Sequence, residues 1–174
     1  MTQLAAARTN PSIIMVVGVG GAGGNAVNHM WNLGIKGVDF MVCNTDQQAL
    51  DKSPVELKVR LGSEGLGAGN DPENGRKAAI ESLDVVRQRF EASGTKMVFI
   101  TAGMGGGTGT GASPVIAKLA KEMGMLTVGI VTSPLAVEGK IRYEQAFRGI
   151  EELRPNVDSL LIISNEDIRE LYGR

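Results

Sequence analysis

The chain has 174 residues, of which 43% are hydrophobic and 21% charged, a composition typical of a single soluble domain with its own hydrophobic core. The net charge of −1 argues against polynucleotide binding, because nucleic-acid-binding domains usually carry a basic excess. A single cysteine, Cys43, excludes an internal disulfide and fits a reducing cytoplasm, and a single histidine, His29, leaves no Cys/His cluster to hold zinc.

The first half of the sequence alternates apolar runs with helical patterns. Residues 1–12 are polar and alanine-rich without the apolar core of a signal peptide, and no apolar stretch reaches the length of a membrane span. We therefore expect a flexible arm at 1–12 and no membrane insertion. The β-branched run 13–17 predicts a strand buried on both faces, and 25–33 predicts a helix. Another strand is expected at 38–43, with Cys43 as a small buried hydrophobe, and a short edge strand at 55–61.

A glycine-rich loop at 62–71 is followed by a long predicted helix at 74–92. Its apolar stripe has helical spacing and consists of Ala79, Ile80, Leu83, Val86 and Phe90. A strand is predicted at 97–101, before the segment of highest glycine density, 103–111. The next helix is expected to face inward with Val115, Ile116, Leu119, Ala120 and Met123.

The last quarter continues the alternation, with strands predicted at 126–131 and 157–163. The helix between them has an apolar stripe of Tyr143, Ala146, Phe147, Ile150 and Leu153, and a final helix is expected at 166–172. Strands alternating with helices predict an α/β fold, a doubly wound and mostly parallel sheet with helices on both faces. Ligands of such folds bind at the carboxyl ends of the strands, which is where the glycines of this sequence occur.

The first glycine motif, 18–25, contains G-x-G-x-x-G between a predicted strand and a predicted helix. Glycines allow close approach of a phosphate, and the helix N-terminus offers free N–H groups. Asp46 follows the second strand, where dinucleotide enzymes place a ribose-binding carboxylate. An NAD-dependent oxidoreductase domain therefore remains an alternative, and a tight turn without a ligand is a second one.

The second glycine motif, 105–111, reads G-G-G-T-G-T-G. A second anion cradle exceeds what a pyrophosphate needs and suits a triphosphate, while Thr108 and Thr110 add hydroxyls for phosphate oxygens or a metal-bound water. Such glycine density is costly for folding, which argues against a purely structural loop. The usual P-loop is absent, because Gly139-Lys140 is followed by Ile141 instead of Ser or Thr. Backbone amides are therefore expected to bind the phosphates.

These motifs resemble the tubulin/FtsZ GTPase family over nearly the whole chain, from 13 to 174. The resemblance rests on the 105–111 signature, on 18–27, on Asn-Thr-Asp at 44–46, on 67–69 and on Glu-Gly-Lys at 138–140. It implies a guanine-nucleotide-binding domain at 13–174 that stops before the family's central helix and C-terminal domain. Two departures affect the expected sugar contacts: the turn 133–137 lacks the family's phenylalanine, and residue 141 is Ile where Lys is usual.

The resemblance also implies the site residues. They are Gly20, Gly21, Ala22, Gly24, Asn25, Asn44, Ala68, Gly69, Gly105, Gly106, Gly107, Thr108, Gly109, Pro134, Glu138, Arg142 and Asn165. In this assignment 21–25 surrounds the α- and β-phosphates, 68–69 senses the γ-phosphate and 105–109 forms the main β/γ-phosphate cradle. Glu138 and Arg142 would contact the ribose and Asn165 the guanine, with Mg²⁺ held mainly by phosphates and water.

Simpler structural roles stay open for some of these residues. Glu138 and Arg142 also suit an exposed i, i+4 ion pair, and Asn44 and Asp46 suit helix caps. The resemblance implies no catalytic residue within this chain, because the family completes hydrolysis with acidic groups from a neighbouring subunit. It further implies self-association into filaments, contacts with other cell-division proteins and a cytoplasmic, midcell location. A pure assembly module without nucleotide chemistry remains the other alternative.

Overall fold

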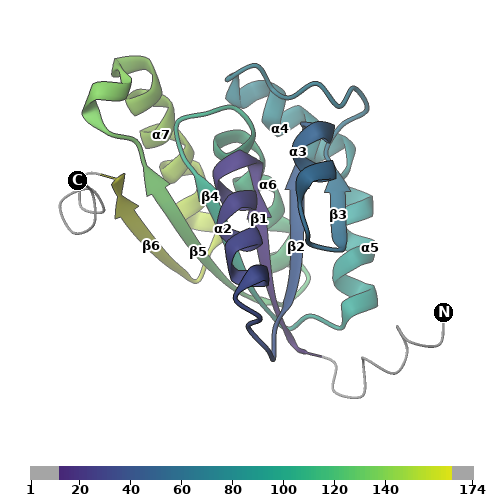
Figure 1. The fold of residues 1–174 in the computed structure, drawn as a ribbon. Coiled ribbons are helices and arrows are strands. Elements are labelled where there is room, and N and C mark those ends of the chain that lie inside the picture. Colours follow the sequence, from purple (N-terminus) through teal and green to yellow (C-terminus); the bar gives the residue numbers. More distant parts are fainter. Residues whose placement is uncertain (1–11, 166–174) are drawn as a thin grey trace.

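The computed structural model describes residues 12–165, which form one α/β unit (Figure 1). The strands are β1 (Ile14–Val19), β2 (Asp39–Asn44), β3 (Leu57–Arg60), β4 (Met97–Gly103), β5 (Leu126–Ser133) and β6 (Ser159–Ser164). The helices are α2 (Gly20–Asn32), α3 (Gln47–Lys52), α4 (Pro72–Glu81), α5 (Leu83–Ser93), α6 (Thr108–Glu122) and α7 (Lys140–Leu153), with 3₁₀ turns at Ala136–Glu138 and Arg154–Asn156. The predicted arm falls mostly outside the described residues, and the predicted helix at 166–172 falls entirely outside them.

The six strands form one parallel sheet in the order β3-β2-β1-β4-β5-β6. The chain winds outward from β1 to β3, then crosses back to β4 beside β1 and winds outward in the other direction. This arrangement confirms the predicted doubly wound fold, with β3 as the predicted edge strand. The order reverses between β1 and β4, and folds of this type bind their ligands at that reversal.

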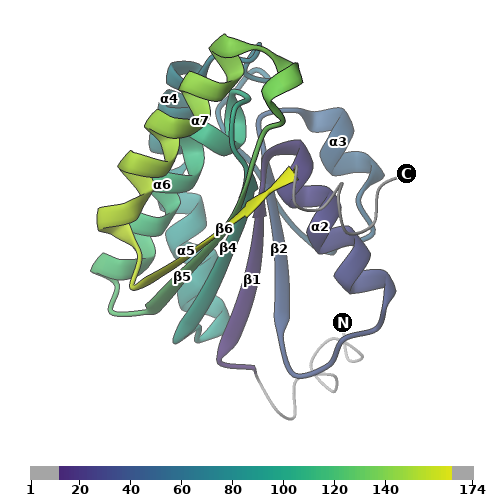
Figure 2. The ribbon, with the colours of Figure 1, turned by 90° about the vertical axis from the view of Figure 1, so that its left-hand side faces the viewer.

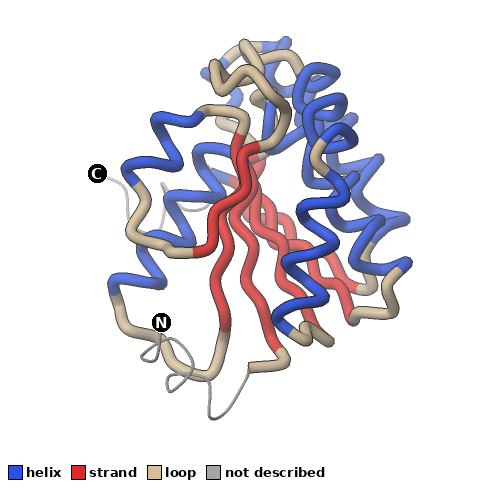
Figure 3. The backbone as a smooth tube through the Cα atoms, turned by 90° about the vertical axis from the view of Figure 1, so that its right-hand side faces the viewer, coloured by secondary structure: helices blue, strands red, loops and turns tan. Residues whose placement is uncertain are grey.

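The sheet lies between two layers of helices, as Figure 2 shows from the side. On one face, α2 and α3 cover a cluster that contains Val27, Phe40 and Leu50. On the other face, α4 to α7 cover the larger cluster, which includes Met15 and Phe90. The loops that leave the carboxyl ends of the strands gather at the top of Figure 3. Among residues 12–165 no helix is both long and apolar enough to cross a membrane.

The predicted helix 74–92 is two helices, because the chain breaks at Ser82. The hydroxyl of Ser82 accepts the Gly62 N–H at 2.8 Å and donates to the Arg60 carbonyl at 3.3 Å. These bonds tie the helical segment to the end of β3. A serine side chain that bonds to backbone outside its own helix competes with the helix, and here it ends α4 and starts α5.

The helix that follows each glycine motif begins earlier than predicted. The first helix starts at Gly20 instead of residue 25, and α6 starts at Thr108, inside the 105–111 signature. Part of each glycine motif is therefore the first turn of a helix. Glycine has low helix propensity, so packing against the sheet, and not local preference, sets these starts.

Three predicted inward-facing side chains are exposed instead. Ile80 is 48% exposed on α4, and Tyr143 and Phe147 are 50% and 64% exposed on α7. Their helices bury narrower stripes, led on α7 by Ala146, Gly149, Ile150 and Leu153. Cys43 is completely buried, as predicted.

Candidate functional site

A cleft of about 490 Å³ opens at the carboxyl ends of the strands, on both sides of the β1/β4 reversal. It brings together most of the predicted site residues, although they come from six separate parts of the sequence. The predicted residues that line it are Gly21, Ala22, Asn44, Ala68, Gly69, Gly106, Gly107, Thr108, Gly109, Pro134, Glu138, Arg142 and Asn165.

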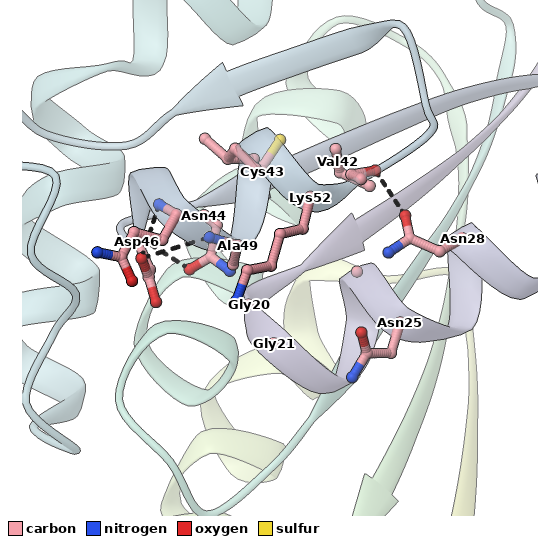
Figure 4. Close-up of a pocket in the computed structure, with 14 residues that line it drawn as sticks. Gly20, Gly21, Asn25, Asn28, Val42, Cys43, Asn44, Asp46, Ala49 and Lys52 are labelled. Carbon is pink, nitrogen blue, oxygen red and sulfur yellow. Dashed lines mark hydrogen bonds between the residues drawn. The ribbon is translucent and has the colours of Figure 1, made fainter.

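Four predicted residues lie beside this cleft and do not line it. Gly20, Gly24 and Asn25 line a neighbouring cleft of about 260 Å³ between α2 and α3 (Figure 4). The two clefts share Gly21 and other residues near the end of β2. Gly105 is buried, and its N–H donates to the Thr110 hydroxyl at 2.8 Å. Thr110 thus holds the loop in shape and is not available to a ligand as the sequence suggested.

Two helix N-termini face the main cleft without side-chain caps. Helix α2 begins after Val19 and α6 after Gly107, and in neither case does the N-cap side chain bond to the first turn. The neighbouring helices differ: Asp46 caps α3 and Asp71 caps α4 through their carboxylates. The first N–H groups of a helix have no partner within the helix and carry the positive end of its dipole. The α2 and α6 termini are therefore suited to bind an anion.

The two glycine motifs are in direct contact at these termini. A Cβ on Gly20, which has φ +78°, would lie 2.9 Å from the Gly109 nitrogen, and a Cβ on Gly103 would lie 2.6 Å from the Ala22 side chain. Glycine at these two positions therefore allows the two helix ends to lie this close together. The sequence placed the cradles 80 or more residues apart, and the fold joins them into one surface.

Side-chain charge contributes little to this surface. Among the described residues that line the main cleft, Arg142 is the one cation. Its Nε lies 4.0 Å from Glu138 Oε1, so the simpler prediction of an i, i+4 ion pair is correct, while both residues also line the cleft. The other Glu138 oxygen accepts the Leu135 N–H. An anion in this cleft would therefore be bound mainly by backbone N–H groups.

The end of β2 carries the predicted caps. Asp46 accepts the N–H groups of Gln48 and Ala49 at 2.9 and 3.4 Å, and Asn44 accepts the Asp46 N–H at 3.2 Å. The alternative role as caps is thus correct for Asp46, whose carboxylate is engaged at α3 and not free in the manner of a ribose-binding group.

Several lining residues were missed by sequence reasoning. They are Val19, Thr45, Ala49, Gly67, Asn70, Gly103, Met104 and Thr132, together with Asp46, which was weighed only as a dinucleotide contact or a cap. Thr45 had a usable signal, because a polar residue directly after a buried strand lies at the ligand-binding edge. Thr132, directly after the strand predicted at 126–131, had the same signal, whereas the apolar Met104 had none.

Comparison with known proteins decides the family. The model described as "Tubulin/FtsZ family, GTPase domain" matches residues 13–173. The chain belongs to the tubulin/FtsZ family. The site residues predicted by resemblance therefore lie in a fold and a sequence of that family.

Members of the tubulin/FtsZ family with high similarity come from several organisms. The cell division protein FtsZ of Porphyromonas gingivalis (strain ATCC BAA-308 / W83) is 53% identical over 165 residues, which is 93% of this chain and 36% of that protein. The FtsZ of Wigglesworthia glossinidia brevipalpis is 52% identical over 169 residues, covering 95% and 44%. An empty FtsZ dimer from M. jannaschii superposes with a TM-score of 0.90 at 39% identity, covering 99% of this chain and 51% of that one. The chain thus spans about half, or less, of the length of these tubulin/FtsZ relatives.

Proposed function

We propose that this chain binds GTP and GDP in the main cleft and forms the nucleotide-binding half of an FtsZ-type GTPase. The observation that carries the proposal is the convergence of two uncapped helix N-termini on a cleft in which Arg142 is the one cation among the described lining residues. This arrangement suits an extended chain of phosphates bound by backbone N–H groups. A dinucleotide has two phosphates and needs one such terminus, so the geometry favours a triphosphate over NAD.

The positions of the lining residues support separate roles along the nucleotide. Gly21 and Ala22, on the first turn of α2, would contact the inner phosphates. The 106–109 turn would hold the outer phosphates, and 68–69 on the opposite wall would contact the terminal one. Arg142 and Glu138 would contact the ribose, with Asn165 at the guanine.

Magnesium would be bound through phosphate oxygens and water. Within 12–165 no group of three or more His, Cys, Asp or Glu side chains is placed to hold a metal ion. The hydroxyl of Thr108 and the nearby amide of Asn44 fit contacts to metal-bound water, which is the usual way proteins hold Mg²⁺ with a nucleotide.

Hydrolysis would be shared between subunits. Preorganised N–H groups in the cleft would stabilise charge that develops on the phosphates. Among the described residues that line the cleft, Asp46 and Glu138 carry carboxylates. Asp46 caps α3 through Oδ1 and Glu138 pairs with Arg142, so we assign neither as a general base. We therefore propose that a neighbouring subunit supplies the acidic groups, in filaments that act in bacterial cell division at midcell with other division proteins.

Calorimetric titration of the purified chain with GTP, GDP, ATP and NAD tests this proposal. We expect saturable binding of GTP and GDP at one site and weaker or no binding of NAD. Preferential NAD binding would instead support the oxidoreductase alternative. No binding of any nucleotide would support an assembly module that uses the fold without nucleotide chemistry.

A further inference from the structure

Thr45 connects the wall of the cleft formed by α6 to the loop at 62–71. Its Oγ lies 2.6 Å from the Oγ of Thr108, the first residue of α6. Its backbone carbonyl accepts the Gly67 N–H at 3.2 Å. The next residue, Asp46, pairs with the same loop in an antiparallel bridge. One residue thus contacts both sides of the region where a terminal phosphate would lie.

The threonine pair is protected from water on one side only. Both residues line the cleft, but Thr45 is only 5% exposed, whereas Thr108 is half-buried. Among the hydrogen bonds found within 12–165, the one between these two hydroxyls is the only one that either hydroxyl makes. A buried hydroxyl that lost this partner would be left unsatisfied, which gives the pair a defined geometry.

Each hydroxyl has one hydrogen to donate, and this sets the direction of the chain of hydrogen bonds. If Thr108 donates its hydrogen to a phosphate oxygen, its bond to Thr45 requires Thr45 to donate. Hydrogen bonds in such a row strengthen one another, so the Thr45 donor makes Thr108 a better donor to an anion. In the absence of an anion the pair can bond in either direction.

We propose that Thr45 is a positioning residue that orients the Thr108 hydroxyl toward the terminal phosphate. Through its bond to Gly67 it also couples that contact to the loop that carries Ala68 and Gly69. The inference rests on the proposed function, since it assumes that the phosphates of GTP lie in the main cleft. Thr45 itself touches no phosphate in this arrangement and acts only through Thr108.

The test replaces the hydroxyl of Thr45 without changing its shape. In the 174-residue chain, Thr45→Val should weaken GTP binding by about three- to tenfold, the range for loss of one hydrogen bond that supports an ionic contact. GDP binding should weaken less, because GDP lacks the phosphate next to the 68–69 wall. Thr45→Ser should restore the difference between GTP and GDP. Calorimetry measures the GTP and GDP affinities of the unmodified chain and of both variants.

Two further variants separate positioning from stability. Thr127 is another buried threonine, remote from the cleft, whose hydroxyl bonds to the Met125 carbonyl. Thr127→Val should lower the thermal stability about as much as Thr45→Val does, but it should leave the ratio of GTP to GDP affinity unchanged. Thr45→Val combined with Thr108→Val should weaken GTP binding little more than Thr108→Val alone, because Thr45 acts through Thr108.

The inference is overturned if Thr45→Val binds GTP as the unmodified chain does. It is also overturned if Thr45→Val weakens GTP and GDP equally, or if Thr45→Ser behaves like Thr45→Val. These results are distinct from failure of the proposed function, in which the unmodified chain binds neither nucleotide.

Discussion

Gly107 is the residue at which added side-chain volume should most directly disturb the cleft. A Cβ at this position would lie 2.8 Å from the Ala68 Cβ and 3.0 Å from the Asp71 nitrogen. Its φ of −86° and ψ of −62° are accessible to any residue, so the obstacle is space and not backbone conformation. Gly107 therefore sets how closely the wall at 68–71 approaches α6.

We predict that Gly107→Val loses nucleotide binding and keeps its fold. The valine would displace the loop at 68–71 and occupy the space next to the phosphates, while the sheet and its core remain packed. Calorimetry should show at least about tenfold weaker GTP binding, roughly the cost of a contact worth 1.4 kcal/mol, with an unchanged circular dichroism spectrum. Ala92→Val, on an exposed face of α5, is the control and should bind normally. Normal GTP binding by Gly107→Val would show that this turn is not the phosphate cradle.

Burial of Cys43 should make the chain less stable at alkaline pH. Complete burial raises the pKa of the Cys43 thiol from 9.0 to about 12. Between these values the unfolded chain loses the thiol proton and the folded chain retains it. The free energy of unfolding should therefore be unaffected by Cys43 below about pH 9 and should fall as pH rises from about 9 toward about 12, by at most roughly 1.4 kcal/mol per pH unit.

Urea unfolding at a series of pH values from 8 to above 10 checks this prediction. Cys43→Ala should be less stable at pH 8, because it leaves a small cavity, but should lose less stability on the way to high pH. All other ionisable groups are the same in both proteins, so the difference in slope isolates the thiol. Equal slopes for the two proteins would contradict the prediction.

At the scale of single residues, the sequence predicted backbone sites better than side-chain sites. Glycine motifs such as 105–111 mark places where the backbone itself must approach something, and four of the seven residues at 105–111 do line the cleft. The contact of Thr45 to Thr108 could not be predicted, because it joins positions 63 residues apart. Local pattern carries no information about such a pairing until the order of the strands is known.

At the scale of elements, the approach of α4 to α6 shapes one wall of the cleft. A Cβ on Gly111 would lie 1.9 Å from the Pro72 carbonyl oxygen, and a Cβ on Gly75 would lie 2.4 Å from the Gly107 carbonyl oxygen. The two helices are therefore in backbone contact. This contact places the loop before α4, which carries Ala68, against the N-terminus of α6.

We predict that Gly111→Ala destabilises the chain by about 2–3 kcal/mol or more, because one methyl group must separate two packed helices. Gly24→Ala is the matched control: it is also helical, and its Cβ would have no heavy atom within 4 Å. Removal of a helical glycine there should be neutral or stabilising by up to about 1 kcal/mol. Urea unfolding of both variants measures the difference. Similar stability of the two variants would show that α4 and α6 can separate at no cost.

Strand positions were predicted well and helix ends poorly, and no helix was predicted at α3 (Gln47–Lys52). Short apolar runs between helical patterns located every described strand. A strand buried on both faces is apolar at consecutive positions and therefore leaves a continuous signal. The starts of α2 and α6 and the break at Ser82 were missed, since each depends on contacts with distant backbone. The Ser82 hydroxyl, for example, bonds to groups 20 and 22 residues away.

At the scale of the whole molecule, one part of the sheet is not covered by any helix within residues 12–165. Figure 2 shows α2 and α3 over β1 and β2, while β6 forms the far edge of the sheet. Leu161 on β6 is 54% exposed. An open edge strand with exposed apolar side chains favours association with other chains. We therefore expect the 174-residue polypeptide to self-associate through this region, in a manner separate from any filament contact at the cleft.

The final prediction concerns turnover and assembly of the 174-residue polypeptide. Its described cleft offers surfaces for phosphates but no free carboxylate suited to activate water, since Asp46 caps α3 and Glu138 pairs with Arg142. The proposed division of labour between subunits therefore predicts negligible GTP hydrolysis by the pure polypeptide at any concentration. A steady-state phosphate-release assay across a concentration series is the direct measurement.

The same polypeptide should nevertheless dock onto filaments of an intact relative. It carries the cleft that would receive a neighbour, but it spans only 36% and 44% of the length of the two FtsZ relatives that it matches. Added in small amounts to such a protein, it should occupy one filament end and stop growth there, which electron microscopy would record as shorter filaments. Gly107→Val, which we expect not to bind GTP, is the control and should leave filament length unchanged. Concentration-dependent GTP turnover by the pure polypeptide would instead show that the catalytic groups lie within residues 1–174, and the cleft would then have to be understood as a complete active site.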